Sequence, residues 1–176
     1  MKYSDIYRLY STSQPKDAIH QALREVPVDD SDEQYEDRSP LHLACQYGDT
    51  EGVKILLERD AEPNTKDANG STPIHILGRT SADRADEDKL KEIAVMLIEQ
   101  GANIPRSAKN TTALIECVRN RHFKMAEAII NSGARVNSTD LNGENVLFGF
   151  CAASGDIRRD IRFAKKELDE SVQYRS

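Results

Sequence analysis

Apolar residues along this chain form short clusters at helical spacing, and the clusters come in pairs. One pair spans residues 41–45 and 53–57, and a polar stretch that contains Gly48 and Asp49 separates the two clusters. Apolar positions three or four residues apart indicate the buried face of a helix, and a Gly-Asp pair indicates a turn. The pattern therefore predicts two short helices joined by a tight turn.

This helical pair recurs along the chain. A four-residue phrase precedes each first helix: Ser-Pro-Leu-His at 39–42, Thr-Pro-Ile-His at 72–75, Thr-Ala-Leu-Ile at 112–115 and Asn-Val-Leu-Phe at 145–148. The phrases start 33, 40 and 33 residues apart, which is typical of a repeat architecture whose units pack on their neighbours. Ser39 and Thr72 stand where a hydroxyl can cap backbone N–H groups, and a proline follows each at the first helical position. We therefore expect the first helices to begin at these phrases.

The segments between the helical pairs contain turn residues. Small-residue stops follow the second helices at 60–61, 101–102 and 133–134, and Asn-Gly pairs stand at 69–70 and 142–143. Glycine tolerates a positive φ, and Asn-Gly favours a tight hairpin turn. We expect each linker to project as a β-finger roughly perpendicular to the helices. One repeat then consists of two helices and a finger.

These features together resemble the ankyrin-repeat family. The resemblance covers roughly residues 37–155 and is carried by Gly-Ser-Thr-Pro-Ile-His at 70–75, Leu-His-Leu-Ala at 41–44, Gly-Asp at 48–49, Val-Lys-Ile-Leu-Leu at 53–57 and Gly-Ala-Arg-Val-Asn at 133–137. It implies an all-α repeat solenoid, an ankyrin stack of helix-turn-helix units with short β-finger hairpin loops. In such an array the function usually lies on an extended surface and not in a buried catalytic pocket.

We expect a single ankyrin-repeat domain over residues 1–176, made of five units. The expected bounds are 1–36 for an N-terminal capping repeat, 37–69, 70–109 and 110–142 for three repeats, and 143–176 for a C-terminal capping repeat. The first unit is degenerate and carries charged residues on its outer face, as expected where a stack ends against water. In the last unit, apolar residues at helical spacing from Ile157 to Val172 predict a long amphipathic helix.

The unit at 70–109 departs from the pattern by about eight extra residues near 80–88, several of them acidic. Insertions in repeats map to surface loops, often on a functional side, and lengthening a loop costs little free energy. We expect a tolerated surface loop there. The following finger, at 104–110, is one residue short and basic, so we expect it to be irregular.

Charge and composition exclude several classes of partner. The net charge is −6 and the pI is near 5.3, so the chain lacks the positive surface that binds phosphate backbones and anionic lipids. No apolar run reaches the ~18 residues that span a bilayer, and the N-terminus lacks the apolar stretch of a signal peptide. We therefore expect a soluble, cytoplasmic protein that binds neither nucleic acid nor membrane.

Candidate catalytic and metal-binding residues are few. The chain has three cysteines, which lie far apart and suit reduced thiols better than a disulfide framework or a zinc site: Cys45, Cys117 and Cys151. His42 and Cys45 lie three residues apart and could pair as base and nucleophile or contribute to a metal site. The family resemblance instead implies that His42 bonds neighbouring turns and that Cys45 fills a small-residue slot. His20 and His122 are isolated in the pattern, so we expect no catalysis, metal or cofactor.

The resemblance also implies where a partner binds. In ankyrin-repeat proteins the partner usually lies in the concave groove formed by the finger tips and the inner ends of the first helices. The residues at those positions that we expect to bind a partner are Tyr35, Arg38, Gln46, Tyr47, Lys66, Asn69, Arg79, Lys109, Arg119, Asn120 and Leu141. Tyrosine and arginine are enriched at binding hot spots.

Five of these positions are basic although the chain is acidic overall: Arg38, Lys66, Arg79, Lys109 and Arg119. We therefore expect a partner that presents an acidic, carboxylate-bearing segment. A charge-reversed variant, Arg79→Glu with Arg119→Glu, is expected to lose binding and to keep its fold.

The sequence thus indicates a non-catalytic protein–protein interaction module, which we expect to be a monomer. An alternative is a dedicated inhibitor of one target protein, either a microbial or viral effector or a toxin-neutralising immunity protein. That alternative rests on the short chain, with two capping units and no room for a second domain. Capture of one stoichiometric partner would favour the inhibitor, whereas a bound metal or a Cys45-dependent activity would favour an enzyme.

Overall fold

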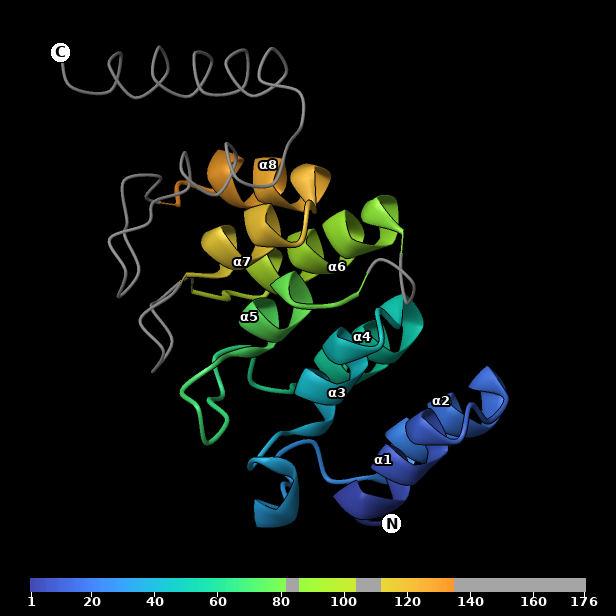
Figure 1. Ribbon diagram of the computed structural model, residues 1–176. Helices are drawn as coiled ribbons and strands as arrows, with labels where there is room; N and C mark the ends of the chain where they lie inside the picture. The colour runs from blue at the N-terminus through green and yellow to red at the C-terminus, as the bar shows by residue number, and fades with distance from the viewer. Residues whose placement is uncertain (82–85, 104–111, 135–176) are drawn as a thin grey trace, which may run out of the picture.

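The computed structural model describes residues 1–81, 86–103 and 112–134, and these ranges hold helices joined by turns and loops, without a β-strand. Within these ranges, helices that follow one another in the chain pack in pairs (Figure 1). Their bounds are Tyr3–Ser11 (α1) and Lys16–Glu25 (α2), Pro40–Gln46 (α3) and Thr50–Leu57 (α4), Pro73–Gly78 (α5) and Glu87–Glu99 (α6), and Ala113–Arg119 (α7) and Phe123–Asn131 (α8), with a short 3-10 helix at Glu33–Tyr35 (η1). None of these helices combines the length and the apolar character needed to cross a bilayer. The predicted C-terminal unit at 143–176 and the finger at 104–110 lie outside the described residues.

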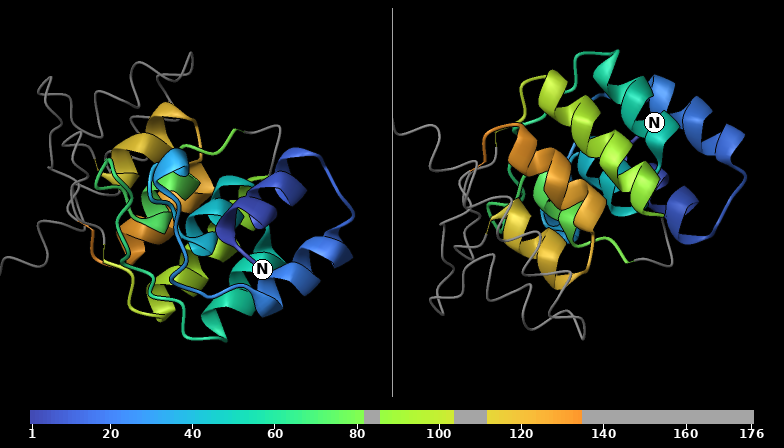
Figure 2. Two further views of the ribbon diagram at one scale, coloured as in Figure 1. Left: turned by 90° about the horizontal axis from the view of Figure 1, so that it is seen from below. Right: turned by 90° about the horizontal axis from the view of Figure 1, so that it is seen from above.

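The pairs stack in chain order, from α1 and α2 at one end to α7 and α8 at the other (Figure 1). The first helices form one layer, in which α3 contacts α5 and α5 contacts α7. The second helices form the other layer, in which α2, α4, α6 and α8 follow one another (Figure 2). Fully buried apolar side chains come from every pair: Ile6, Leu23, Leu43, Leu56, Leu77, Leu97, Leu114 and Ile129. Because neighbouring pairs share this core, the described part is the all-α repeat solenoid that the sequence predicts.

The first helices begin at the repeated phrases. α3 and α5 start at Pro40 and Pro73, where the missing N–H leaves no helical hydrogen bond unmade. α7 starts after Thr112, whose Oγ1 accepts a hydrogen bond from the backbone N–H of Ile115 at 3.3 Å. The phrase therefore marks a helix start even where alanine replaces the proline.

The extra residues near 80–88 do not all belong to a surface loop. α6 has 13 residues, against 8 in α4 and 9 in α8, and it begins inside the expected insertion. Asp86 Oδ1 accepts from the Lys89 N–H at 2.9 Å, and this cap lowers the pKa of the Asp86 carboxyl. Glu87 Oε1 accepts from the backbone N–H of Phe123, the first residue of α8, at 2.9 Å. Acidic residues expected in a loop therefore start a longer helix and bind the next repeat.

Buried polar contacts attach the N-terminal pair to the stack. The Tyr10 hydroxyl donates to Asp49 Oδ2 at 2.7 Å, and His20 Nε2 lies 3.0 and 3.1 Å from the two Asp49 carboxylate oxygens. Asp49 immediately precedes α4, so this carboxylate joins α1 and α2 to the next pair. Arg59 Nη1 donates to two carbonyl oxygens at the C-terminal end of α2, at 2.6 and 2.7 Å. His20, which is isolated in the sequence pattern, is therefore part of this interface.

Candidate partner-binding surface

The finger and first-helix-end positions of successive repeats lie next to one another along the stack. We call the described ones the finger-side surface: residues 35–38, 46–47, 66–71, 79–80 and 119–120. Figure 1 shows two of its parts, the loop between α4 and α5 and the turn that contains η1, projecting beyond the helices. Hydrogen bonds and ion pairs link these parts to each other.

Backbone and side-chain hydrogen bonds close the finger between α4 and α5 without a β-strand. The Asp67 N–H donates to the carbonyl oxygen of Ser71 at 2.9 Å, and the Gly70 N–H donates to the carbonyl oxygen of Asp67 at 2.8 Å. Asp67 Oδ1 accepts from the backbone N–H groups of Asn69 and Ser71, at 2.9 and 2.8 Å. An aspartate that bonds the backbone two residues on forms an Asx turn, so the predicted tight turn is present without flanking strands. The Ala68 N–H donates to the carbonyl oxygen of Glu36 at 2.8 Å. This finger therefore lies against the turn that precedes α3.

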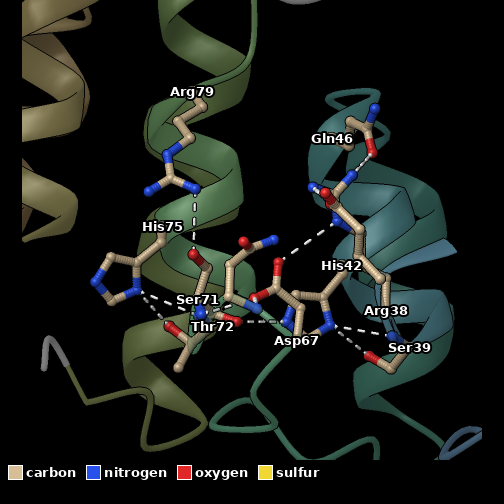
Figure 3. A network of polar contacts seen from close by, with 11 residues as sticks. Arg38, Ser39, His42, Gln46, Asp67, Ser71, Thr72, His75 and Arg79 are labelled. Atoms are coloured by element: carbon tan, nitrogen blue, oxygen red, sulfur yellow. Dashed lines mark hydrogen bonds and ion pairs between the residues drawn. The ribbon is translucent and has the colours of Figure 1, made fainter. Parts of the chain in front are cut away.

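His42 joins the first helix of one repeat to the finger that precedes the next (Figure 3). Its Nε2 lies 3.0 Å from the carbonyl oxygen of Ser71, while its Nδ1 lies 3.2 Å from the Ser39 backbone N and 2.9 Å from the Ser39 hydroxyl. A carbonyl oxygen only accepts, so Nε2 carries the proton and Nδ1 accepts. Burial lowers the pKa of His42 to about 4, so the ring is neutral. His75 contacts Thr72 in the same way, with Nδ1 2.9 Å from Oγ1.

This geometry gives His42, His122, Cys45 and Cys117 structural roles, and Cys151 lies outside the described residues. Both ring nitrogens of His42 are bonded, so the ring has no nitrogen left to activate Cys45, and burial raises the pKa of the Cys45 and Cys117 thiols. His122 is bonded and not isolated, because its Nε2 donates to the carbonyl oxygen of Thr80 at 2.7 Å. Among the residues that the structure describes, no three His, Cys, Asp or Glu side chains converge to hold a metal ion.

Arg38 lies at the centre of the polar network between the turn that contains η1 and the finger between α4 and α5 (Figure 3). Its Nη1 donates to Gln46 Oε1 at 2.9 Å, and its Nε lies 3.5 Å from Asp67 Oδ2. Its Nη2 pairs with the carboxylate of Glu36. The Asp67 side chain is fully buried, so its charge is partly desolvated and needs this guanidinium. Arg38 therefore fixes the end of α3 to the finger, and carboxylates of the same chain balance its charge.

Arg79 follows α5 at the position that Gln46 has at the end of α3, and its contact with Ser71 repeats the contact between Gln46 and Arg38. Its Nη1 donates to the Ser71 hydroxyl at 3.1 Å, and its Nη2 lies 3.0 Å from Glu116 Oε1 on α7. Asn120 Nδ2 adds hydrogen bonds to the carbonyl oxygens of Gly78 and Glu116, at 3.1 and 2.9 Å. The network therefore runs from α3 through the finger and α5 to α7.

Both predicted tyrosines pack against the N-terminal pair. The Tyr35 ring centroid lies 4.3 Å from that of Tyr7 and 5.7 Å from that of Tyr3. Tyr47 stacks on Tyr10 at 4.8 Å. Tyr35, Tyr47 and Tyr7 are half-buried. Each predicted tyrosine is therefore partly accessible as a residue, while its ring packs against the capping pair.

Of the other predicted binding residues, some are exposed and two lie outside the described residues. Lys66 and Arg119 are exposed, and Asn69 takes part in the finger turn through its backbone N–H. Lys109 and Leu141 lie outside the described residues.

The charge balance of the finger-side surface differs from the sequence-based expectation. Arg38 and Arg79, two of the five basic residues behind the expected acidic partner, are paired with carboxylates of the chain itself. Reversing Arg79 to glutamate would place two carboxylates together at a side chain, Glu116, that is 12% exposed. The double charge reversal expected to leave the fold intact is therefore a destabilising change.

The carboxylates of this network were not among the predicted site residues. Asp67 carried a local signal, because an aspartate three residues before a glycine is typical of a turn. Glu116 also carried a signal, because it is a charged residue at a first-helix position where the earlier repeats have the apolar residues Leu43 and Ile76. Glu36 stands at a finger position of its repeat, but its pairing with Arg38 could not be predicted because it depends on how the turn before α3 folds.

Comparison with known proteins agrees with this architecture. A family model described as "Ankyrin repeats (many copies)" matches residues 22–77, and one described as "Ankyrin repeat" matches residues 109–141, so the two cover about half of the chain. The chain is similar to neurogenic locus notch homolog protein 1 of Mus musculus, 31% identical over 133 residues, and of Xenopus laevis, 34% identical over 133 residues. Both alignments cover 76% of this chain and 5% of the relative. A transient receptor potential cation channel subfamily A member 1 homolog of Caenorhabditis elegans is 39% identical over 62 residues, 35% of this chain and 5% of that protein. The chain thus spans only a small part of the length of these relatives.

Proposed function

The chain belongs to the ankyrin-repeat family, whose repeats generally mediate protein–protein interactions, and we propose that its finger-side surface binds a partner protein without catalysing a reaction. The observation that supports this most is the polar network beneath that surface. Arg38, Asp67 and Arg79 fix the finger and the helix ends to one another, while nearby side chains such as Lys66 and Ala68 remain exposed. A surface that is held rigid before binding loses little conformational entropy when a partner docks.

The acidic partner expected from the sequence is the narrower form of this proposal. Among the described residues it is supported by Lys66 and Arg119, the exposed basic side chains of the finger-side surface. Because Arg38 and Arg79 serve the fold, Lys66 and Arg119 are the appropriate positions for a charge reversal.

Affinity capture with two matched variants tests the proposal. The finger-side variant is Lys66→Glu with Arg119→Glu, and the control is Lys54→Glu with Lys91→Glu, which reverses two exposed charges on the second helices α4 and α6. We expect the finger-side variant to lose the captured partner and the control to retain it. A partner that binds both variants as tightly as the parent chain, or that is lost only by the control, contradicts binding through the finger-side surface.

The number of captured partners separates two roles. A single stoichiometric partner supports the alternative of a dedicated inhibitor of one target protein. Several partners bound by the same surface support a scaffold or adaptor.

A further inference from the structure

The turn before α3 carries a concentrated negative charge. Residues 29–37 contain six carboxylates and neither lysine nor arginine. The segment folds tightly around η1, because the N–H groups of Tyr35 and Asp37 both donate to the carbonyl oxygen of Asp32, at 2.8 and 3.2 Å. The side chains of Glu33 and Asp37 therefore extend from one small turn.

Within the described part of the chain, only some of these carboxylates have partners. Asp30 and Asp32 accept backbone hydrogen bonds, and Glu36 pairs with Arg38. The other three carboxylates form no hydrogen bond or ion pair with the residues that the structure describes: Asp29, Glu33 and Asp37. Since Arg38 is already held by two carboxylates and an amide, the turn keeps an unbalanced negative charge.

Aromatic rings adjoin the same turn. Tyr35 belongs to η1, and its ring lies 4.3 Å from that of Tyr7 on α1, with both rings half-buried. Beneath them the Tyr3 side chain is fully buried, and its hydroxyl has no hydrogen-bond partner within the described ranges. The Tyr3 ring centroid lies 5.7 Å from that of Tyr35, so an unsatisfied polar atom belongs to a side chain that packs against the tyrosine pair.

Carboxylates next to accessible tyrosine rings form an environment that suits cationic side chains. A guanidinium or ammonium group is attracted to the face of an aromatic ring and forms charge-assisted hydrogen bonds with carboxylates. An acidic segment would meet like charge at the same place. The charge at this end of the finger-side surface is therefore complementary to a basic partner.

We propose that the acidic-aromatic patch formed by Tyr7, Glu33, Tyr35 and Asp37 binds an arginine- or lysine-rich segment of the partner protein. The inference rests on the proposed function and specifies the partner chemistry at the N-terminal end of the surface. At this end of the surface the expected partner charge is opposite to the one expected from the sequence, because that expectation counted Arg38 as available and left out the carboxylates around it. Lys66 and Arg119 remain the positions that would meet an acidic segment elsewhere on the surface.

Fluorescence anisotropy with two labelled peptides tests this inference. One probe alternates arginine with glycine, and the other alternates glutamate with glycine. The patch variant is Glu33→Gln with Asp37→Asn, in which asparagine suits the positive φ of 52° at residue 37. The control is Glu51→Gln with Glu58→Gln, which removes one exposed carboxylate from α4 and one from the residue that follows it. Circular dichroism confirms that both variants are folded.

We expect the basic peptide to bind the parent chain and the control alike, and to bind the patch variant about threefold to tenfold more weakly. Tyr35→Leu is expected to weaken binding as well, because it keeps an apolar side chain but removes the ring. Equal losses in the patch variant and the control would indicate unspecific charge attraction and overturn the proposal. Preference for the acidic peptide, or no binding of either probe, would overturn it too. These peptide results do not decide whether the finger-side surface binds a partner protein. That proposal is contradicted separately, when the Lys66→Glu and Arg119→Glu variant captures its partner as well as the parent chain does.

Discussion

His42 Nε2 donates to the carbonyl oxygen of Ser71 at 3.0 Å, so one buried imidazole joins a helix to a finger 29 residues further along the chain. The same ring accepts from Ser39 at its other nitrogen. Repeats hold together through their neighbours, and here a hydrogen bond with fixed donor and acceptor supplements the apolar packing between two of them.

Protonation of His42 is expected to make stability depend on acid pH. An unfolded histidine has a pKa of 6.5, and burial lowers the pKa of His42 to about 4 in the folded chain. Between these values the unfolded state binds more protons, so the free energy of unfolding falls as pH drops from 6.5 towards 4 and is fully retained above 6.5. For His42→Gln we expect the free energy of unfolding to fall by about 3 kcal/mol less than that of the parent chain over this pH interval. Urea denaturation of both proteins across this pH range measures the difference, and parallel curves would contradict it.

The contact between Tyr10 and Asp49 is expected to stabilise the attachment of the N-terminal pair. Tyr10→Phe removes a hydroxyl that donates to a buried carboxylate at 2.7 Å, at an expected cost of about 1.5–3 kcal/mol. Tyr7→Phe is the control, since the Tyr7 hydroxyl makes no hydrogen bond with the described residues. Thermal denaturation should show a lower midpoint for Tyr10→Phe alone. Equal midpoints for the two variants would mean that the hydroxyl contributes nothing.

The contact between Tyr10 and Asp49 also leaves no room for a side chain at Gly52, so we expect a glycine to be needed there for stability. A Cβ at this position in α4 would lie 2.6 Å from Asp49 Oδ2 and 2.9 Å from the Tyr10 hydroxyl. Gly52→Ala is therefore expected to destabilise the chain by about 1–3 kcal/mol, although alanine is the better helix former. In a double-mutant cycle with Asp49→Ala the cost should shrink, because the crowded carboxylate is gone. An unchanged cost in the Asp49→Ala background would place the clash elsewhere.

Exchanging Arg79 and Glu116 for each other is expected to destabilise the chain less than reversing the charge of either residue alone. Arg79→Glu leaves two carboxylates next to each other at a mostly buried site, with an expected loss of about 1–3 kcal/mol. Glu116→Arg alone has the same kind of cost. The combined exchange restores opposite charges, so its stability should exceed that of both single variants. Chemical denaturation of the four proteins tests this, and additive losses in the double variant would argue against a direct pair.

The sequence predicted the architecture well because the fold is local and repetitive. Helix starts at Pro40 and Pro73 follow from capping and proline geometry within a few residues. The charge of the surface was less predictable, since it depends on pairs between repeats: Arg79 meets Glu116, 37 residues away, and Tyr10 meets Asp49, 39 residues away. A count of basic residues at finger positions cannot tell which of them the fold has already neutralised.

Amide hydrogen exchange of the chain, alone and in complex with its captured partner, is the most direct test of binding through the finger-side surface. Slower exchange is expected in the complex at residues 35–38, 66–71 and 79–80, with no change in the second helices α4 and α6. Protection confined to those second helices, with unchanged exchange in the fingers, would contradict the proposed mode of binding.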